Sequence, residues 1–226
     1  MDASLVLPYL QAQYPLRLTE VSLARDSGSM AYRATGPDGM YFFRDVKPAF
    51  SSTAQSAVDI QLFLSRKGVP VPRILPLTNG TSYTLETEAD GQHLYVLYEY
   101  IEGGEPDMEQ DAARVGELVG RMHTAMEGYH GLLIPRDKPF FIDRYLSLQQ
   151  QMGYPEDKVE AFRRHGNLLW ERVRHLPCGY CHGDLYSGNL HRAQNGALYL
   201  LDFDTSCHAF PLYDVALVCN ATDYFH

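Results

Sequence analysis

Alternating apolar and polar positions in the first hundred residues predict a β-sheet. Segments with this alternation, short and separated by turn residues, are Val21–Arg25, Tyr32–Thr35, Tyr41–Val46, Arg73–Leu77, Ser82–Thr87 and His93–Glu99. The stretch Gly36-Pro37-Asp38-Gly39 is typical of a tight hairpin turn between two of them. This half of the chain therefore favours an antiparallel sheet whose neighbouring strands are joined by short connections.

Apolar residues at helical spacing predict helices before and between these strands and over most of the second half of the chain. A helix is expected over Leu5–Tyr14, and Ser52-Thr53-Ala54-Gln55 predicts a capping box for a helix that ends near Lys67. Asp107-Met108-Glu109-Gln110 predicts a second capped helix, and the spacing of apolar residues from Val159 to Leu176 predicts a long amphipathic helix. The pattern as a whole indicates an α+β fold.

Composition limits the function classes. The chain has 226 residues, of which 45% are hydrophobic, enough for one or two packed cores. A formal net charge of −9, with 19 Lys and Arg, argues against nucleic acid as a partner. No apolar run is long enough to span a bilayer, and the N-terminus shows no signal-peptide pattern. Four cysteines without a framework spacing suit a reducing compartment, so we expect a cytoplasmic protein; its oligomeric state is left open.

The pair Cys178 and Cys181 has the C-x-x-C spacing and raises two alternatives. A zinc site would need a second pair of ligands, but Cys207 and Cys219 lie far apart in the sequence. A redox pair would be expected at a helix start after a strand, whereas this pair runs into a stretch with other chemistry. Buried structural thiols are therefore the favoured interpretation.

That stretch contains the strongest functional signal. Its sequence is H-G-D-x-x-x-x-N, ending in Asp184 and Asn189, and an apolar run then leads to Asp202-Phe203-Asp204. A carboxylate can accept a hydroxyl proton, while an amide oxygen and a carboxylate at a strand end can hold the same metal ion. Such a spacing is typical of phosphoryl transfer.

These motifs resemble the aminoglycoside phosphotransferase and choline kinase-like family, which shares the protein-kinase fold. Protein kinases have Arg where this chain has Gly183, so the small-molecule branch fits better. The resemblance implies a two-lobed α+β fold. Residues 1–98 would form an N-terminal lobe with a five-stranded antiparallel sheet plus a helix, 99–104 a hinge, and 105–226 a mostly helical C-terminal lobe, incomplete at its C-terminus.

The resemblance also implies the catalytic roles. Asp184 would accept the proton of the substrate hydroxyl and orient it, and Asn189 and Asp202 would bind Mg²⁺. Asp204 stands where protein kinases have Gly, and it could be a second metal ligand, an acceptor contact or a structural residue. Two supporting roles are expected, loop stabilisation by His182 and an anchor for the catalytic-loop backbone at Asp214.

The nucleotide would be ATP or GTP. The backbone between the first two strands, at Ser27, Gly28 and Ser29, could cradle phosphates, although a single Gly is also consistent with a simple hairpin turn. At the hinge, the carbonyl of Glu99 and the N–H of Ile101 would face the base edge.

Arg44 lies where a kinase-like third strand carries its phosphate-pairing Lys, and a guanidinium can hold phosphate oxygens with two parallel bonds. The alternative is a solvated edge charge. Asp59 is the nearest helix acid that could orient Arg44, and it could equally be a solvated side chain.

The expected function is transfer of the γ-phosphate of ATP or GTP to a hydroxyl of a small molecule of aminoglycoside, amino-alcohol or sugar type. Two alternatives stay open. One is a nucleotide-binding module with weak or no catalysis, favoured by the thin Gly loop and by Arg44 in place of Lys. The other is an atypical bacterial Ser/Thr protein kinase with the same D-F-D layout.

Overall fold

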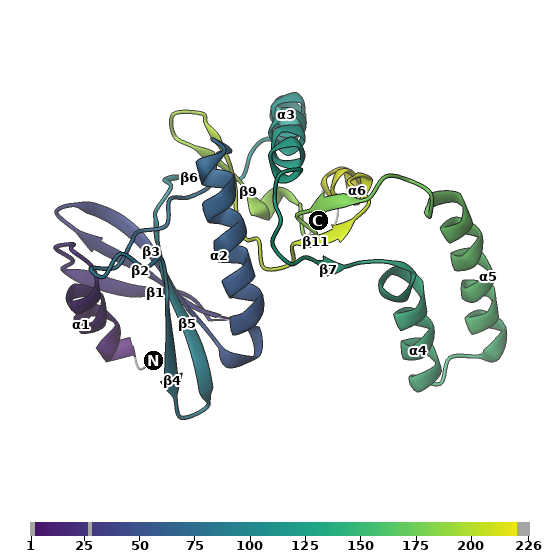
Figure 1. Ribbon diagram of the computed structural model, residues 1–226, viewed down its shortest axis with the longest axis horizontal. Coiled ribbons are helices and arrows are strands. Elements are labelled where there is room, and N and C mark those ends of the chain that lie inside the picture. The colour runs from purple at the N-terminus through teal and green to yellow at the C-terminus, as the bar shows by residue number, and fades with distance from the viewer. Residues whose placement is uncertain (1–2, 27–28, 221–226) are drawn as a thin grey trace. The chain divides into compact units, whose positions relative to one another are not determined.

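The computed structural model describes residues 3–26 and 29–220, which form two compact units. The first contains Met1–Gly131 and Tyr186–Thr205, and the second contains Leu132–Leu185 and Ser206–His226 (Figure 1). The lobe limits at 98, 99–104 and 105–226 stay a prediction. The compact units follow other limits, because the helix after the proposed hinge contacts the helix at Ser51–Arg66, and a later hairpin contacts both that helix after the hinge and the segment Gly103–Gly104.

The first unit is built on a five-stranded antiparallel sheet, which confirms the fold class. Its strands are β1 (Glu20–Asp26), β2 (Ser29–Gly36), β3 (Gly39–Val46), β4 (Thr84–Glu88) and β5 (Gly91–Glu99). Their order is β1-β2-β3-β5-β4. The segment Arg73–Leu77, predicted as a strand, makes only one bridge, between Ile74 and Tyr98. The prolines within and before this segment lack the N–H group that a regular ladder requires.

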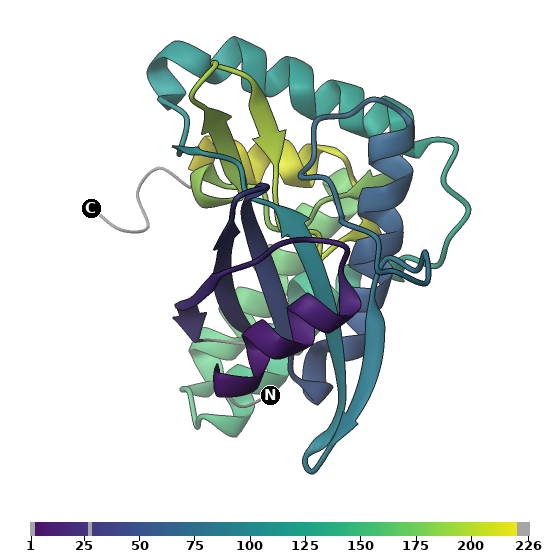
Figure 2. The ribbon, with the colours of Figure 1, turned by 90° about the vertical axis from the view of Figure 1, so that its left-hand side faces the viewer.

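Each face of this sheet is covered by one helix. Helix α1 (Ala3–Gln13) lies across one face, where Phe43 and Tyr95 join its core (Figure 2). Helix α2 (Ser51–Arg66) covers the other face, where Val46 packs against Val58. Because successive side chains of a strand point to opposite faces, β3 contributes alternately to the two cores.

The two predicted capping boxes have different outcomes. Asp107 caps α3 (Met108–Met126) as expected, since its carboxylate accepts from the N–H groups of Glu109 and Gln110. At the start of α2 the prediction is wrong. A 3₁₀ turn at Pro48–Phe50 precedes the helix, and the hydroxyl of Ser51 donates back to the carbonyl of Pro48 instead of capping.

The first unit also holds a small second sheet with the order β10-β9-β6. It consists of β6 (Gly103–Gly104), β9 (Leu190–Ala193) and β10 (Leu198–Leu200), preceded by a 3₁₀ turn at Ser187–Asn189. Gly103 has φ +154°, and a Cβ there would collide with the carbonyl oxygen of Arg192. Pairing of the segment after β5 with β9 therefore requires glycine at this position.

The second unit combines a three-stranded sheet with helices. Its elements are β7 (Ile134–Pro135), a π-helical turn (Pro139–Asp143), α4 (Arg144–Gln151), α5 (Glu156–Val173), β8 (Gly179–Cys181), β11 (Cys207–Ala209) and α6 (Leu212–Asn220). The predicted amphipathic helix is α5. The apolar side of α5 is only partly covered. Val159 is buried, whereas Leu169 is 59% exposed beside an apolar groove.

The cysteines of the second unit separate into two environments. Cys181 and Cys207 are buried and lie opposite each other on β8 and β11, as expected for structural thiols. Cys178 is exposed, so the buried-thiol interpretation is wrong for that residue. Within the described residues, the groups able to hold a metal ion include no cysteine, and no helix is both long and apolar enough to cross a membrane.

Candidate active site

A cavity of about 620 Å³ lies within the first unit, between the α2 face of the sheet and the segment from Gly188 to Thr205. Its wall brings together seven residues that the sequence predicts for the site: Ser29, Arg44, Glu99, Ile101, Asn189, Asp202 and Asp204. Residues more than 150 positions apart in the sequence thus share one concave surface, which is the usual setting for a small-molecule site.

Backbone hydrogen bonds connect the two predicted metal ligands. Asn189 is buried at the end of its 3₁₀ turn, and its carbonyl accepts from the N–H of Leu201 at 2.9 Å. The N–H of Leu200 in turn donates to the carbonyl of Pro70. The position of Asp202, the next residue along the chain, is therefore fixed relative to Asn189 before any ligand binds.

Asp202 adopts a left-handed backbone conformation with φ +56°, the one non-glycine residue in the described ranges with a positive φ. This conformation costs an L-residue about 1–2 kcal/mol, and such strain is found mainly at functional sites. Phe203 next to it is buried and holds the turn in the core. The strained turn leaves the Asp202 side chain exposed at the cavity wall.

Arg44 on β3 forms a two-point ion pair with Asp204. Nη2 donates to Oδ2 at 2.7 Å and Nη1 to Oδ1 at 3.4 Å, and the side chains are 16% and 23% exposed. Burial by itself lowers the pKa of Arg44, but the charge and hydrogen bonds of Asp204, together with nearby Tyr98, raise it overall. A fixed positive charge therefore stands at the cavity wall.

Tyr98 on β5 forms part of the same wall and is buried. Burial raises the pKa of Tyr98 to about 12, although the adjacent Arg44 opposes this shift. The phenol is consequently neutral at physiological pH and contributes a hydrogen-bonding group beside the guanidinium.

Asp59 is not brought to Arg44. It is exposed on α2 and lies near Tyr129, whose pKa is raised by burial and by the Asp59 charge. Ala57 and Gln61 are the α2 residues that line the cavity. The partner of Arg44 is Asp204, a role that the sequence left among several alternatives.

The predicted hinge follows β5 directly. The carboxylate of Glu99 accepts from the backbone N–H of Arg73 at 3.0 Å and from its Nε at 3.4 Å, which holds the strand end in place. Glu99 and Ile101 both line the cavity. Of the predicted phosphate loop, Ser29 begins β2 at the cavity wall, whereas Ser27 and Gly28 lie outside the described residues.

The second unit holds the first part of the predicted catalytic loop, up to Leu185. Asp214, buried in the first turn of α6, accepts from the backbone N–H of His182 at 2.7 Å and of Gly183 at 2.9 Å. Arg136 donates to the carbonyl of Gly183 at 2.9 Å, and this glycine has φ +83°. The backbone before Asp184 is thus held through the N–H groups of His182 and Gly183 and through the carbonyl of Gly183, and Asp184 itself is exposed.

The family model described as the phosphotransferase enzyme family matches residues 21–225. The chain belongs to this family. A homoserine kinase of Methylobacillus flagellatus is 26% identical over 195 residues, which cover 84% of this chain and 59% of that kinase. The chain thus spans less than two thirds of the length of this curated relative.

Solved structures show the same fold as this phosphotransferase-family chain. Amicoumacin kinase hAmiN, in complex with AMP-PNP, Ca²⁺ and Ami, superposes with a TM-score of 0.76 at 22% identity, covering 98% of this chain and 69% of that one. A microcompartment-associated aminopropanol kinase superposes with a TM-score of 0.75 at 18% identity, covering 96% and 73%.

One cavity residue of this family member was not singled out from the sequence. His191 on β9 lines the cavity, and its Nε2 is a buried atom without a hydrogen-bond partner among the described residues. The sequence motifs assign no role to His191. Its position two residues after Asn189 was the available signal, because both residues line the cavity.

Proposed function

We propose that this chain carries the nucleotide site and the catalytic loop of a phosphotransferase. It would move the γ-phosphate of ATP or GTP to a hydroxyl of a small molecule. The observation that carries the proposal is the single cavity shared by Asn189, Asp202 and the ion pair of Arg44 with Asp204. Family membership supports the same class of reaction.

Asn189 and Asp202 would hold the Mg²⁺ ion of the nucleotide complex. Their donor set fits this ion, because a neutral amide oxygen and a carboxylate oxygen are hard ligands that leave room for phosphate and water. When bound, Mg²⁺ supplies neutralisation of the charge on the β- and γ-phosphates. The backbone link between Asn189 and Leu201 fixes the position of one ligand residue relative to the other, which reduces the reorganisation needed on binding.

Arg44 would bind phosphate oxygens from the opposite wall. Asp204 holds the guanidinium fork at the cavity, so that Arg44 is oriented before the nucleotide arrives. The backbone carbonyl of Glu99 and the N–H of Ile101 would contact the base edge, with Tyr98 behind the base. A base stacked in this cavity would also lie within reach of the buried Nε2 of His191.

Asp184 would orient the acceptor hydroxyl and accept its proton. Its loop is already held by the two N–H groups that donate to Asp214, which favours a carboxylate with a fixed direction. Because phosphoryl transfer proceeds through a loose transition state, positioning accounts for most of this contribution.

The acceptor class we favour is a small alcohol that also carries an amine. Curated relatives include homoserine kinases and a probable choline kinase, and one structural neighbour is an aminopropanol kinase. The formal net charge of −9 is compatible with a cationic acceptor. These names apply to the relatives, and the acceptor of this chain is a proposal.

The decisive experiment compares the wild-type chain with Asp184→Asn. We expect Mg²⁺-dependent phosphorylation of an amino alcohol panel, including homoserine, choline and aminopropanol, to fall by about 10²–10⁴-fold in the variant. Nucleotide affinity, measured by calorimetry, should stay within about twofold. Equal turnover in both proteins would contradict the catalytic assignment. Phosphorylation of a protein Ser or Thr instead would replace the small-molecule acceptor with the protein-kinase alternative.

A second candidate is a nucleotide-binding module without catalysis. The observation that favours it is the closed ion pair, since Arg44 is already neutralised by Asp204. Thermal-shift titration separates the two candidates, because a catalytic site should be stabilised more by Mg·ATP than by ATP with EDTA. Equal stabilisation together with no turnover would favour the module.

A further inference from the structure

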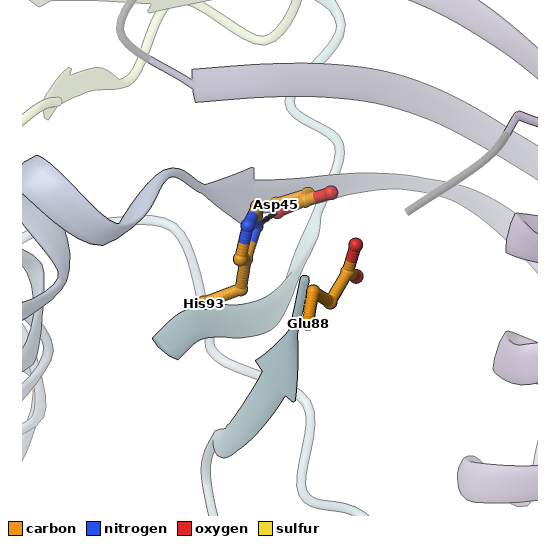
Figure 3. A group of neighbouring side chains, drawn as sticks. All are labelled: Asp45, Glu88 and His93. Atoms are coloured by element: carbon orange, nitrogen blue, oxygen red, sulfur yellow. Dashed lines mark hydrogen bonds and ion pairs between the residues drawn. The ribbon is translucent and has the colours of Figure 1, made fainter. Parts of the chain in front are cut away.

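A second cluster of polar side chains lies on the α1 face of the sheet, opposite the cavity. It contains Asp45 on β3, Glu88 on β4 and His93 on β5 (Figure 3). Asp45 is 1% exposed and His93 is 4% exposed, whereas Glu88 is half-buried. One ligand atom from each side chain lies within 4.8 Å of the other two. Three neighbouring strands thus direct three potential metal ligands to one point.

The hydrogen bonds around this cluster give the histidine a fixed orientation. Nε2 of His93 lies 2.9 Å from Oδ1 of Asp90, and Nδ1 lies 2.5 Å from Oδ1 of Asp45. A histidine that binds a metal usually donates its second ring N–H to a carboxylate, which fixes the ring and raises its basicity. Asp90 occupies that outer position, so that Nδ1 is the nitrogen that faces the cluster.

Glu88 has an outer partner as well. The hydroxyl of Tyr95 donates to Oε1 of Glu88, and Tyr95 itself is buried in the core against α1. Each of the two side chains beside Asp45 is therefore oriented by a residue behind it. Such second contacts are what distinguish a built site from acidic residues that are merely close together.

We propose that Asp45, Glu88 and His93 form a binding site for a divalent transition-metal ion, with Zn²⁺ as the best match. Zn²⁺ binds both imidazole nitrogen and carboxylate oxygen, and three protein ligands leave a fourth tetrahedral position for water. Mg²⁺ matches less well, because it prefers an all-oxygen octahedron and retains several waters. The site is separate from the Mg²⁺ site proposed for Asn189 and Asp202.

In the metal-free arrangement a proton takes the place of the ion. With both carboxylates ionised, they only accept hydrogen bonds, so that both ring nitrogens of His93 would donate. Burial lowers the pKa of His93, but the bonds to Asp45 and Asp90 outweigh it and raise the pKa overall.

The geometry requires only a small adjustment. With metal–ligand bonds of about 2.0 Å in a tetrahedral site, neighbouring ligand atoms lie about 3.3 Å apart. Nδ1 of His93 and Oδ1 of Asp45 must therefore separate from 2.5 Å, while Glu88 moves inward. Glu88 and the Asp90 turn are the solvent-accessible members of the group, and they provide the entry route.

The test uses the full chain after removal of metal with a chelator. Calorimetric titration at pH 7.5 should show about one Zn²⁺ per chain at this site, and Co²⁺ should give the visible absorption of a tetrahedral site without a thiolate band. Zn²⁺ at about 100 times its Kd should raise Tm by about 5–10 °C. Mg²⁺ at equal concentration should produce neither signal.

Variants locate the ion. His93→Gln and Glu88→Gln should each weaken Zn²⁺ binding by at least about tenfold, and Glu88→Gln leaves the bonds among Asp45, His93 and Asp90 intact if the first variant fails to fold. The matched control His165→Gln removes an exposed histidine of α5 and should bind Zn²⁺ like the wild type. Absence of Zn²⁺ binding in the wild type would overturn the proposal and leave only a protonated histidine clamp. Undiminished binding in Glu88→Gln would place the ion elsewhere and overturn it equally.

Discussion

The two faces of β3 make a direct comparison, because Arg44 and Asp45 are consecutive residues that point in opposite directions. On one face Arg44 pairs with Asp204, which is 160 residues away in the sequence. On the other face Asp45 pairs with His93 of the adjacent strand β5. Both are ion pairs of a cation with a carboxylate, yet their surroundings give them different chemistry.

Accessibility is what separates the two pairs. The side chains of Arg44 and Asp204 are 16% and 23% exposed beside a cavity, so an incoming phosphate can compete for the guanidinium. Those of His93 and Asp45 are 6% and 1% exposed beneath the strands, where only a proton or a small ion fits. We call Arg44–Asp204 the exchangeable pair, because a ligand can replace one partner, and we infer that it suits substrate binding. We call His93–Asp45 the enclosed pair, and we infer that it suits stability or metal binding.

The largest expected effect on activity comes from removing Arg44, the cation of the exchangeable pair. Arg44→Ala should lower kcat/KM for the nucleotide by about 10²–10³-fold, because a preorganised charge at the phosphates is lost. Steady-state kinetics with varied ATP measures this. The control Asp59→Asn changes an exposed acid of α2 and should leave kcat/KM within about twofold; an equal loss in both variants would restore the helix acid as the partner of Arg44.

The second prediction concerns Asp204, the carboxylate of the same pair, and tests whether it holds Arg44. Asp204→Asn leaves Arg44 without its charge partner in a mostly buried position, so we expect a loss of about 1–3 kcal/mol in the free energy of unfolding. ATP should restore part of this loss, because its phosphates can replace the carboxylate. Urea unfolding with and without ATP tests both statements, and an unchanged midpoint would mean that Asp204 does not hold Arg44 in solution.

The pair of His93 and Asp45 predicts that the free energy of unfolding decreases as the pH rises, whereas an acid-labile salt bridge is lost as the pH falls. Because Asp45 and Asp90 raise the pKa of His93, with Glu88 nearby, its contribution to stability is complete below the unfolded pKa of about 6.5. It is lost as pH rises through the folded pKa. In EDTA, the free energy of unfolding should therefore decrease by about 1.4 kcal/mol for each unit by which the folded pKa of His93 exceeds its unfolded pKa.

The control for this prediction is His93→Gln, which hydrogen-bonds without titrating in this range. Its unfolding free energy should vary less between pH 6 and pH 8.5, about the interval over which an imidazole titrates. A wild-type protein with the same pH profile as the variant would show that His93 is not protonated in the fold.

The smallest effect is expected at the hydroxyl of Tyr98. Tyr98→Phe keeps the aromatic wall of the cavity but removes a polar group beside Arg44, at a cost of about 1 kcal/mol. This corresponds to a fall of about fivefold in nucleotide affinity, measurable by calorimetry. A larger loss than that of Arg44→Ala would reverse the order of importance along this face.

Much of the exchangeable face was predictable from the sequence. Asn189, the last residue of H-G-D-x-x-x-x-N, and the D-F-D motif line one cavity with Arg44 of β3, whereas Asp184 is not among the lining residues and its catalytic role stays a prediction. The partner of Arg44 was not fixed, since local patterns cannot show which of Asp59 and Asp204 the folded chain brings closer. The cap at Asp107 was predictable because it depends on residues only two and three positions away.

The enclosed face could not be predicted in the same way. Asp45, Glu88 and His93 become neighbours only through the strand order β3-β5-β4 and its register, in which Asp45 is opposite Tyr95 and Glu88 opposite Gly91. A shift of one residue would turn each side chain to the other face. The failed strand at Arg73–Leu77 has a related cause, because alternation alone overlooked the prolines.

The left-handed backbone at Asp202 has a consequence for how this protein can evolve. Glycine would adopt φ +56° without the steric cost, so Asp202→Gly should raise the free energy of unfolding while removing the carboxylate that we propose as a Mg²⁺ ligand. Selection for activity would therefore favour aspartate at position 202, whereas selection for stability would favour glycine. In a thermostable relative without catalytic activity, we expect glycine at this position.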